Sequence, residues 1–576
     1  MPIRLLDTTT LRMRVFMGEN NPGYAILSHT WVEDDEVDFQ EMTAIGHNDQ
    51  HPATLKGGYR KIHSTCEKAR EHDINYAWVD TCCIDKSSSA ELSEAINSMF
   101  KWYRDAARCY VFLSDLEPGS DVGNAMKVCR WYNRGWTLQE LIAPKDLRFY
   151  NQKWEFVGTK TYFKSSVSAI TGIDEEVLID CTVLPDIPVG RRMFWASQRA
   201  TTRTEDLAYC LLGIFDINMP LLYGEGDKAF IRLQEEIIKR STDLSIFWNF
   251  PRTWVGITGD LAASDLRARG YYHDYPCRDL FATAPRDFSE SGGVFVSSKL
   301  AAISIRDFAP TNNGVYFAKA KFVTAEMHGK VSSRYYIMDL EHHQTISTRH
   351  CGMVLQKIGP SLFVRCSVPL AEYVAQGLLD SGLMLVRRPE IEDAYIVTKI
   401  SASIERQMDT CRGHTIHFES DGNMEAVERN FDKVIESPAP RENWDSANKE
   451  FITLGRAFEG YVTLRLVDPR WQWRSGQDFS YCYLACSSEP LLPGAGLQLK
   501  LLEHHDFERR VIRLHGNLGT ERILPRALSH VPRITQDKLT LGDVMVVAKI
   551  GFATEPDYPS YRISITLKFH EDPGWW

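Results

Sequence analysis

The chain has 576 residues, of which 44% are hydrophobic and 25% are charged, and its formal net charge is −10. This length is too great for one hydrophobic core, so several domains are expected. An acidic chain without a long basic run is not expected to have nucleic acid as its main partner, because phosphate binding needs a clustered basic face. The chain also lacks an apolar run of membrane-spanning length and a signal-peptide core, so we expect a cytoplasmic protein without a membrane span.

The cysteines favour a reduced protein without a structural metal. There are 13 of them, an odd number, and none forms a C-x-x-C pair. Cys82 and Cys83 are adjacent in an apolar segment, and adjacent side chains of a strand point to opposite faces. This arrangement suits packing better than metal chelation, so we predict buried thiols and no metal site.

Short apolar runs alternate with helical segments over the first 150 residues. The predicted strands are 24–28, 76–80, 109–114 and 147–150. Helical spacing of apolar residues joins them at 59–69 and 88–103, and a shorter helix fits between 134 and 144. This order predicts an open parallel α/β sheet, which binds ligands beyond the carboxyl ends of its strands.

Polar and aromatic side chains follow the first two predicted strands. Ser28, His29 and Trp31 lie at the end of the first strand, and Asp80 and Asp85 follow the second. Because the carboxyl ends of parallel strands meet at one edge, these five residues are candidate substrate-binding residues. In the alternative interpretation His29 and Trp31 brace the strand end, and the two aspartates cap loops or the following helix.

The short helix predicted between 134 and 144 carries the candidate catalytic residue. Gly135 precedes this helix and Pro144 ends it, which leaves room for about two turns. Trp136 and Glu140 are four residues apart and therefore share one helix face. A ring beside a carboxylate can hold a flat cationic ligand, since the ring stacks and the carboxylate offsets its charge. The alternative is a core indole and a solvated or structural acid.

The pattern of apolar residues changes from helical spacing to alternation near residue 250. Up to that point further helices follow the sheet, with a clear amphipathic pattern at 229–238. Beyond it, alternating and β-branched runs separated by turn residues predict mostly antiparallel, sandwich-like β structure. We therefore expect an α/β domain with a helical extension at 1–250 and two β-rich domains at 251–436 and 445–576. The β-rich half shows no catalytic constellation, so we expect it to bind a protein partner or ligand, or to serve autoinhibition or assembly.

Four blocks of this sequence resemble a known family. The segments 23–31, 76–86 and 134–140, together with 195–226, resemble the signature blocks of the fungal heterokaryon-incompatibility (HET) domain. The resemblance covers roughly residues 1–250. Val32 and Lys86 depart from it, because the family usually has glycine and glutamine at these positions.

The resemblance implies a role in nonself recognition and regulated cell death. HET domains are also remotely similar to TIR domains, which have a flavodoxin-like parallel sheet. In TIR enzymes the glutamate of a Trp-x-x-x-Glu motif cleaves NAD, and the tryptophan lies in the nicotinamide pocket. Carried over by motif position, these roles fall on Glu140 and Trp136. The resemblance thus implies a homo-oligomer that uses NAD as its substrate and retains no cofactor.

The residues are compatible with this chemistry. The nicotinamide of NAD is already a cationic leaving group, so a carboxylate that stabilises the ribosyl cation suffices, without a metal. The sequence also has no Gly-rich dinucleotide fingerprint, which fits NAD as a substrate better than as a bound cofactor. Two alternatives stay open: a non-catalytic, self-associating interaction module, and a nucleophile site that pairs Cys82 or Cys83 with His29.

Overall fold

The computed structural model places most of the chain in two compact units. It describes residues 2–17, 21–48, 50–249, 277–289, 291–296, 307–326, 336–344, 349–366, 371–374, 385–386, 390–413, 415–420, 432–439, 443–445, 450–453, 458–467, 479–488, 498–503, 536–541, 544–555 and 558–569. The first unit consists of the described residues within 1–266, 281–310 and 340–351, and the second unit consists of the other described residues.

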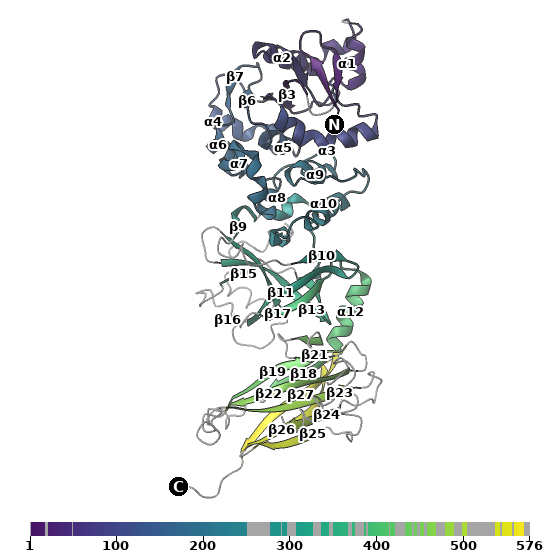
Figure 1. The fold of residues 1–576 in the computed structure, drawn as a ribbon, viewed down its shortest axis with the longest axis vertical. Helices are drawn as coiled ribbons and strands as arrows, with labels where there is room; N and C mark the ends of the chain where they lie inside the picture. Colours follow the sequence, from purple (N-terminus) through teal and green to yellow (C-terminus); the bar gives the residue numbers. More distant parts are fainter. Residues whose placement is uncertain are drawn as a thin grey trace. The chain divides into compact units, whose positions relative to one another are not determined.

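A seven-stranded sheet forms the centre of the first unit (Figure 1). Its order is β2-β1-β4-β3-β5-β6-β7. The strands are β1 (Ile3–Asp7), β2 (Met13–Phe16), β3 (Tyr24–His29), β4 (Tyr76–Trp78), β5 (Arg108–Phe112), β6 (Leu147–Tyr150) and β7 (Phe156–Thr159). β3 pairs in parallel with β4 and β5, and β5 pairs in parallel with β6. The predicted parallel sheet is thus confirmed in its four central strands, and the structure adds β1, β2 and β7 as antiparallel edge strands.

Helices cover both faces of the parallel core. α2 (Gly57–Glu71) connects β3 to β4, whereas α3 (Ser89–Asp105) and α5 (Thr137–Ile142) belong to connections that run toward the other edge. Right-handed crossovers therefore place α2 on one face and α3 and α5 on the opposite face. In Figure 1, α2 lies above β3 and α3 lies below it. Every residue of β3 is buried, as expected for a central parallel strand.

α3 shows how local sequence and packing agree. The Ser88 side chain caps its first turn by accepting from the backbone N–H of Glu91 at 3.3 Å. Trp102 and Tyr103 near its end pack against Trp78 of β4, with ring centroids 5.6 and 5.8 Å apart. The predicted helix at 88–103 is confirmed because its cap and its apolar face both meet their partners.

Two buried cations hold the short helix α5 at its ends. Near its start, the Arg199 guanidinium donates to the carbonyl of Arg134 and to Thr137 Oγ1, both at 3.0 Å. At its end, Lys160 Nζ donates to the carbonyls of Leu141, Ile142 and Pro144 at 3.1, 3.2 and 2.6 Å. Burial lowers the pKa of Arg199 to about 10 and that of Lys160 to about 8. An isolated six-residue helix is unstable in water, so these contacts define α5.

Further helices complete the first unit. They include α1 (Phe39–Ile45), α4 (Val122–Ala125), α6 (Lys164–Thr171), α7 (Glu175–Ile179), α8 (Val189–Phe194), α9 (Asp206–Tyr209) and α10 (Lys228–Ile238). The Glu205 carboxylate, just before α9, accepts from the backbone N–H groups of Gly224 and Gly226 at 2.7 and 3.2 Å. The loop before α10 is therefore tied to the start of α9.

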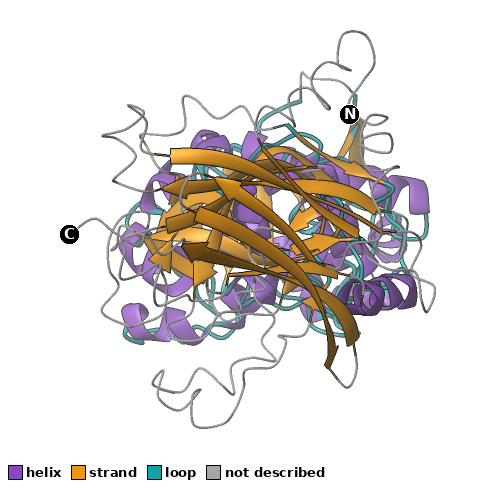
Figure 2. Cartoon of the chain, turned by 90° about the horizontal axis from the view of Figure 1, so that it is seen from below, coloured by secondary structure: helices purple, strands orange, loops and turns teal. Residues whose placement is uncertain are grey.

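The second unit is built mainly of strands, coloured orange in Figure 2. Of the strands from residue 277 onward, the stretches within 281–310 and 340–351 belong to the first unit. The strands from residue 277 onward are β8 (Cys277–Arg278), β9 (Val294–Val296), β10 (Phe308–Thr311), β11 (Gly314–Glu326), β12 (Tyr336–Gln344), β13 (Arg349–Gly359), β14 (Leu362–Cys366), β15 (Ala371–Val374), β16 (Leu385–Val386), β17 (Glu390–Ile396), β18 (Thr415–Ser420), β19 (Asp432–Ala439), β20 (Trp444–Asp445), β21 (Glu450–Ile452), β22 (Phe458–Val467), β23 (Phe479–Ser488), β24 (Gln498–Glu503), β25 (Gln536–Leu541), β26 (Val544–Glu555) and β27 (Tyr558–Phe569). A helix, α12 (Ala402–Gly413), precedes β18.

The pairing confirms a mostly antiparallel, strand-rich C-terminal half. A six-stranded sheet (β20-β21-β18-β27-β26-β25) and a four-stranded sheet (β19-β22-β23-β24) contribute apolar side chains to one shared core, as in a sandwich. The parallel pairs β14–β17 and β18–β27 are exceptions to the antiparallel pattern. Residues 250–276, 440–442 and 446–449 lie outside the described residues, so the three-domain division stays a prediction.

Replacing Lys160 tests whether α5 depends on its buried cation. Lys160→Met leaves three buried carbonyl groups without their donor, and we expect it to lower the free energy of unfolding by about 2–4 kcal/mol. Urea unfolding followed by tryptophan fluorescence measures this. Lys153→Met is the matched control because Lys153 is exposed, and it should change stability by less than about 0.5 kcal/mol. Equal losses in the two variants would contradict this role for Lys160.

Candidate functional site

A buried carboxyl group lies at the carboxyl end of β3. Glu140 Oε2 lies 2.5 Å from Ser28 Oγ, which donates to it. The same hydroxyl oxygen accepts from the indole N–H of Trp131 at 2.8 Å. The connections from β3 and β5 leave in opposite directions, so the sheet order reverses at this point, where open α/β sheets bind their ligands.

The surroundings of Glu140 disfavour its charged form. The residue is only 5% exposed, and Ser28 and Trp131 are fully buried. Burial, with a further contribution from the negative charge of Asp80, raises the pKa of Glu140 to about 8. The hydrogen bond from Ser28 opposes this rise without cancelling it. At neutral pH this carboxyl is therefore mostly protonated.

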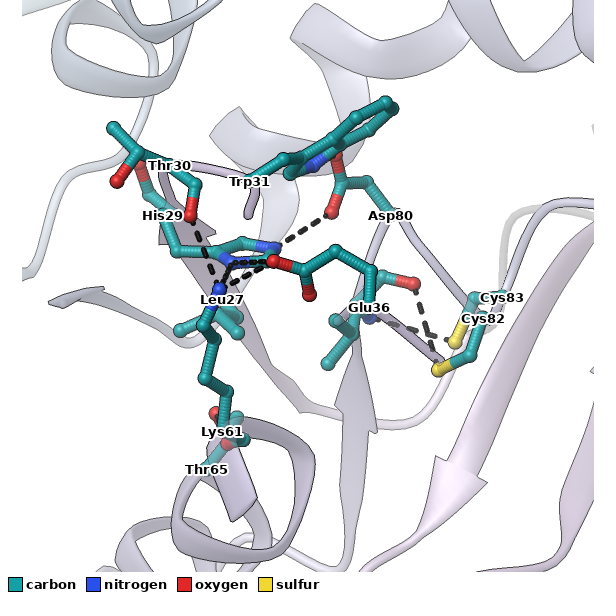
Figure 3. A network of polar contacts seen from close by, with 12 residues as sticks. Leu27, His29, Thr30, Trp31, Glu36, Lys61, Thr65, Asp80, Cys82 and Cys83 are labelled. Atoms are coloured by element: carbon teal, nitrogen blue, oxygen red, sulfur yellow. Dashed lines mark hydrogen bonds and ion pairs between the residues drawn. The ribbon is translucent and has the colours of Figure 1, made fainter. Parts of the chain in front are cut away.

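On the other face of the sheet, a chain of polar contacts engages both nitrogens of His29 (Figure 3). Lys61 Nζ, from α2, lies 3.3 Å from Nδ1 of this imidazole. Because an ammonium group only donates, Nδ1 accepts and Nε2 carries the proton. Nε2 then donates to Asp80 Oδ1 at 3.1 Å. The histidine thus links the ammonium of α2 to the aspartate that follows β4.

Asp80 is the charged counterpart of Glu140. Its second oxygen, Oδ2, accepts from the indole N–H of Trp31 at 3.0 Å. Burial alone would raise the pKa of Asp80, but the hydrogen bond from His29 and the positive charges of Lys86 and Arg134 hold it well below its usual range. Two carboxyl groups at one edge of the sheet therefore have opposite protonation states at neutral pH. Such separated pKa values are a common property of acid–base sites.

An acidic loop completes the contacts of Lys61. Glu36 accepts from Lys61 Nζ and from the backbone N–H of Val32, the latter at 2.9 Å. The loop passes so close to α2 that a Cβ on Gly58 would lie 2.7 Å from the Glu36 Cα. The absence of a side chain at Gly58 allows this approach.

The Trp31 ring lies at the surface and is in contact with two cations. Trp31 is 39% exposed, and its indole N–H donates to Asp80. Lys86 Nζ lies 3.9 Å from the ring centroid and the Arg134 Cζ lies 4.8 Å from it. Both distances are in the range of cation–π contacts.

Trp136 takes a different partner from the one its spacing suggests. Its indole N–H donates to Asp206 Oδ2 at 3.3 Å, and the hydroxyl of Tyr223 donates to the other oxygen of Asp206 at 3.0 Å. The indole tied to Glu140 through Ser28 is instead that of Trp131. Trp131 lies in a 3₁₀ turn (Arg130–Asn133), where no helical period marks a buried face in the sequence.

Asp85 and the adjacent cysteines make local contacts. Asp85 Oδ1 accepts from the backbone N–H and hydroxyl of Ser87 at 3.0 and 2.6 Å, so it caps its own loop. The thiols of Cys82 and Cys83 are buried and contact the backbone of Val79. Figure 3 shows them away from the imidazole of His29, whose nitrogens face Lys61 and Asp80. This geometry does not support a cysteine–histidine nucleophile pair.

Metal-binding clusters and membrane-spanning helices are both absent from the described part of the chain. Within it, no group of three or more His, Cys, Asp or Glu side chains could hold a metal ion. None of the helices in these residues has the length and apolar character needed to cross a membrane.

Comparison with known proteins assigns the residues around this site to a family. Residues 24–130 match the model of the heterokaryon incompatibility protein family (HET). The chain carries a HET domain. Residues 228–316 match a second model, a domain of unknown function (DUF8212).

Part of the chain is similar to a curated protein. The chain is 46% identical over 227 residues to the vegetative incompatibility protein HET-E-1 of Podospora anserina. The match covers 38% of this chain and 16% of that protein, so the chain spans a small part of its relative's length. No solved structure matches the chain.

The HET domain and the residues that follow it bring together most of the residues predicted from the sequence. Ser28 and Glu140 form one buried pair, while His29, Trp31 and Asp80 form a second cluster at the same edge. The side chains of Asp85 and Trp136 form their hydrogen bonds with residues outside both groups. Trp131, Lys61, Glu36, Lys86, Arg134 and Asp206 complete the surroundings, and sequence reasoning had not selected them as site residues.

The raised pKa of Glu140 predicts a pH-dependent stability difference. Its neutral form stabilises the fold fully below the ordinary pKa of 4.5, and this contribution is lost as the pH rises to about 8. Glu140→Gln keeps a neutral side chain of the same shape at every pH. Its thermal stability relative to wild type should therefore increase between pH 5 and 8, by about 1.4 kcal/mol per pH unit, and then level off.

Thermal unfolding of both proteins from pH 5 to 9 measures this difference. Glu94→Gln is the matched control, because Glu94 is an exposed carboxylate on α3 and should show no such trend. A pH-independent difference between Glu140→Gln and wild type would show that Glu140 is already ionised at pH 5.

Proposed function

We propose that this protein is an effector of nonself recognition and regulated cell death. The HET domain supports this role, as does the similarity of the chain to a vegetative incompatibility protein. We propose further that the HET domain hydrolyses the N-glycosidic bond of NAD, with Glu140 as the catalytic residue. The single observation that carries this proposal is an acid of raised pKa at the reversal point of a parallel sheet.

The strand order supports the relationship to TIR domains. Numbered along the chain, the parallel strands β3, β4, β5 and β6 lie in the order 2-1-3-4, which is the beginning of the flavodoxin-like order. Glu140 follows Trp136 in the same Trp-x-x-x-Glu spacing as the TIR motif. Fold similarity alone does not establish chemistry, so the argument rests on the site itself.

The proposed reaction needs little beyond a carboxylate. The bond between the ribose C1′ and the nicotinamide nitrogen breaks, and its electron pair leaves with nicotinamide, which becomes neutral. Water adds to C1′ and releases a proton to solvent, which gives ADP-ribose. An ionised Glu140 would stabilise the ribosyl cation between these events.

The environment of Glu140 is consistent with a silent resting state. Its carboxyl is buried, mostly protonated at neutral pH and bonded to Ser28. A cationic nicotinamide nearby would lower the pKa of Glu140 and favour its ionised form. We propose that self-association opens this site to substrate, so that turnover follows assembly.

The second candidate function is a non-catalytic module that self-associates and signals through a partner. The observation that favours it is the burial of Glu140, because an acid that is 5% exposed and hydrogen-bonded to Ser28 can be purely structural. In this case the β-rich half would supply the partner-binding surface.

Nicotinamide release from NAD distinguishes the two candidates. We expect the wild-type protein to release nicotinamide at a rate per molecule that rises with protein concentration. Glu140→Gln should lower that rate at least a hundredfold, because an amide cannot balance the ribosyl charge. Glu94→Gln is the control and should keep the wild-type rate. No release at any concentration, or equal release by Glu140→Gln, would leave only the interaction module.

The pH profile provides a separate check. Because the free enzyme must ionise a carboxyl whose pKa is about 8, kcat/KM should rise about tenfold per pH unit below that value. It should level off above it. A profile that is flat from pH 5 to 9 would remove Glu140 from the catalytic role.

A further inference from the structure

The surface cluster of Trp31, Lys86 and Arg134 carries two positive charges, which the nearby carboxylate of Asp80 offsets only in part. Both cations contact the indole ring, at 3.9 and 4.8 Å from its centroid. In the region that the structure describes, neither forms an ion pair, whereas Lys61 is paired with Glu36 and Arg4 with Glu91. Lys86 is exposed and Arg134 is half-buried, and both lie against the exposed ring of Trp31.

The nearest acid is already engaged. Asp80 Oδ1 accepts from His29 and Asp80 Oδ2 accepts from Trp31. The bond from Trp31 also restrains its indole, because the N–H points at Asp80. The ring, the ammonium and the guanidinium are thus presented together by three separate segments, namely the loops after β3 and β4 and the turn before α5.

We propose that Trp31, Lys86 and Arg134 form a subsite for the diphosphate group of a nucleotide. A guanidinium offers paired donors that match phosphate oxygens, and an ammonium adds a mobile point charge. With the negative charge of Asp80 included, the cluster keeps a net positive charge, which attracts a diphosphate. The identification of this nucleotide as NAD rests on the proposed function, whereas the anion subsite itself rests on the cluster.

The position of the cluster suits a dinucleotide substrate. Trp31 is three residues after Ser28, and Arg134 is six residues before Glu140, so the cluster borders the same strand end as the buried acid. A ligand whose diphosphate contacts the cations would extend along this edge of the sheet, where ligands of open α/β folds bind.

Direct binding tests the subsite without requiring turnover. Calorimetric titrations would compare ADP-ribose, which has the diphosphate, with nicotinamide riboside, which has no phosphate. We expect Lys86→Gln and Arg134→Gln each to weaken ADP-ribose binding about tenfold or more, and the double variant to weaken it further. Their affinity for nicotinamide riboside should stay within about twofold of wild type. Wild-type affinity for ADP-ribose should also fall as salt is added.

The control is Lys145→Gln, which removes an exposed lysine of the same unit, and its ADP-ribose affinity should equal that of wild type. Thermal unfolding of each variant shows that the fold is kept. Unchanged ADP-ribose affinity in the double variant, an equal loss in the control, or no binding by wild type would overturn the subsite. Inorganic diphosphate that binds as tightly as ADP-ribose would overturn its assignment to a nucleotide.

Failure of the subsite can be told from failure of the proposed function. If wild type releases nicotinamide but the double variant binds ADP-ribose normally, the function stands and the subsite is wrong. If the double variant loses ADP-ribose binding while no protein releases nicotinamide, the subsite stands as a nucleotide-binding site and the hydrolase is wrong.

Discussion

The hydrogen bond between Ser28 and Glu140 joins the central strand of the sheet to the helix that carries the candidate catalytic acid. The two residues are 112 positions apart, and both are buried. Within the described residues, no ion pair compensates the carboxyl group, so desolvation keeps it neutral at physiological pH. A neutral, hydrogen-bonded acid can stay in the interior at little cost, which a charged one could not. The need to keep Glu140 neutral and hydrogen-bonded therefore determines how α5 and the end of β3 are held together.

The same edge of the sheet also carries Asp80, an acid that is ionised where Glu140 is protonated. Asp80 is stabilised as an anion because His29 and Trp31 both donate to it, and Lys61 fixes the tautomer of the histidine. The negative charge of Asp80 in turn helps to keep Glu140 protonated. The two carboxyl groups are therefore coupled, and any change that neutralises or displaces one of them shifts the other. A cationic ligand bound near Asp80 and Glu140 would therefore change the pKa values of both carboxyl groups.

The helix between these groups is short, and its position depends on tertiary contacts. Arg199 holds its first turn and Lys160 holds its last carbonyls, although both cations lose solvation on burial. Such buried donors leave few alternative positions for α5. Glu140 is thus placed by contacts with residues that follow it in the chain, within the same unit as the HET domain.

The sequence by itself determined the elements whose pattern is local. β3, β4, β5 and β6 are short apolar runs, and α2 and α3 show helical spacing, so their order already predicts a parallel sheet with a site at its edge. Ser28, His29, Asp80 and Glu140 could be selected because strand ends and a short helix converge there. The edge strands β1, β2 and β7 were not predicted, because their pairing depends on neighbours and not on a strong alternation of their own.

Only the tertiary structure decided which side chains meet and which charges they carry. Spacing placed Trp136 beside Glu140, yet its indole turns to Asp206, and Trp131 occupies the position next to Ser28. Lys86 and Arg134 are distant in sequence and meet only on the face of Trp31. The protonation states of Glu140 and Asp80 depend on burial and on partners far along the chain. No local sequence pattern predicts these protonation states and contacts, because desolvation and long-range hydrogen bonds exist only once the chain has folded.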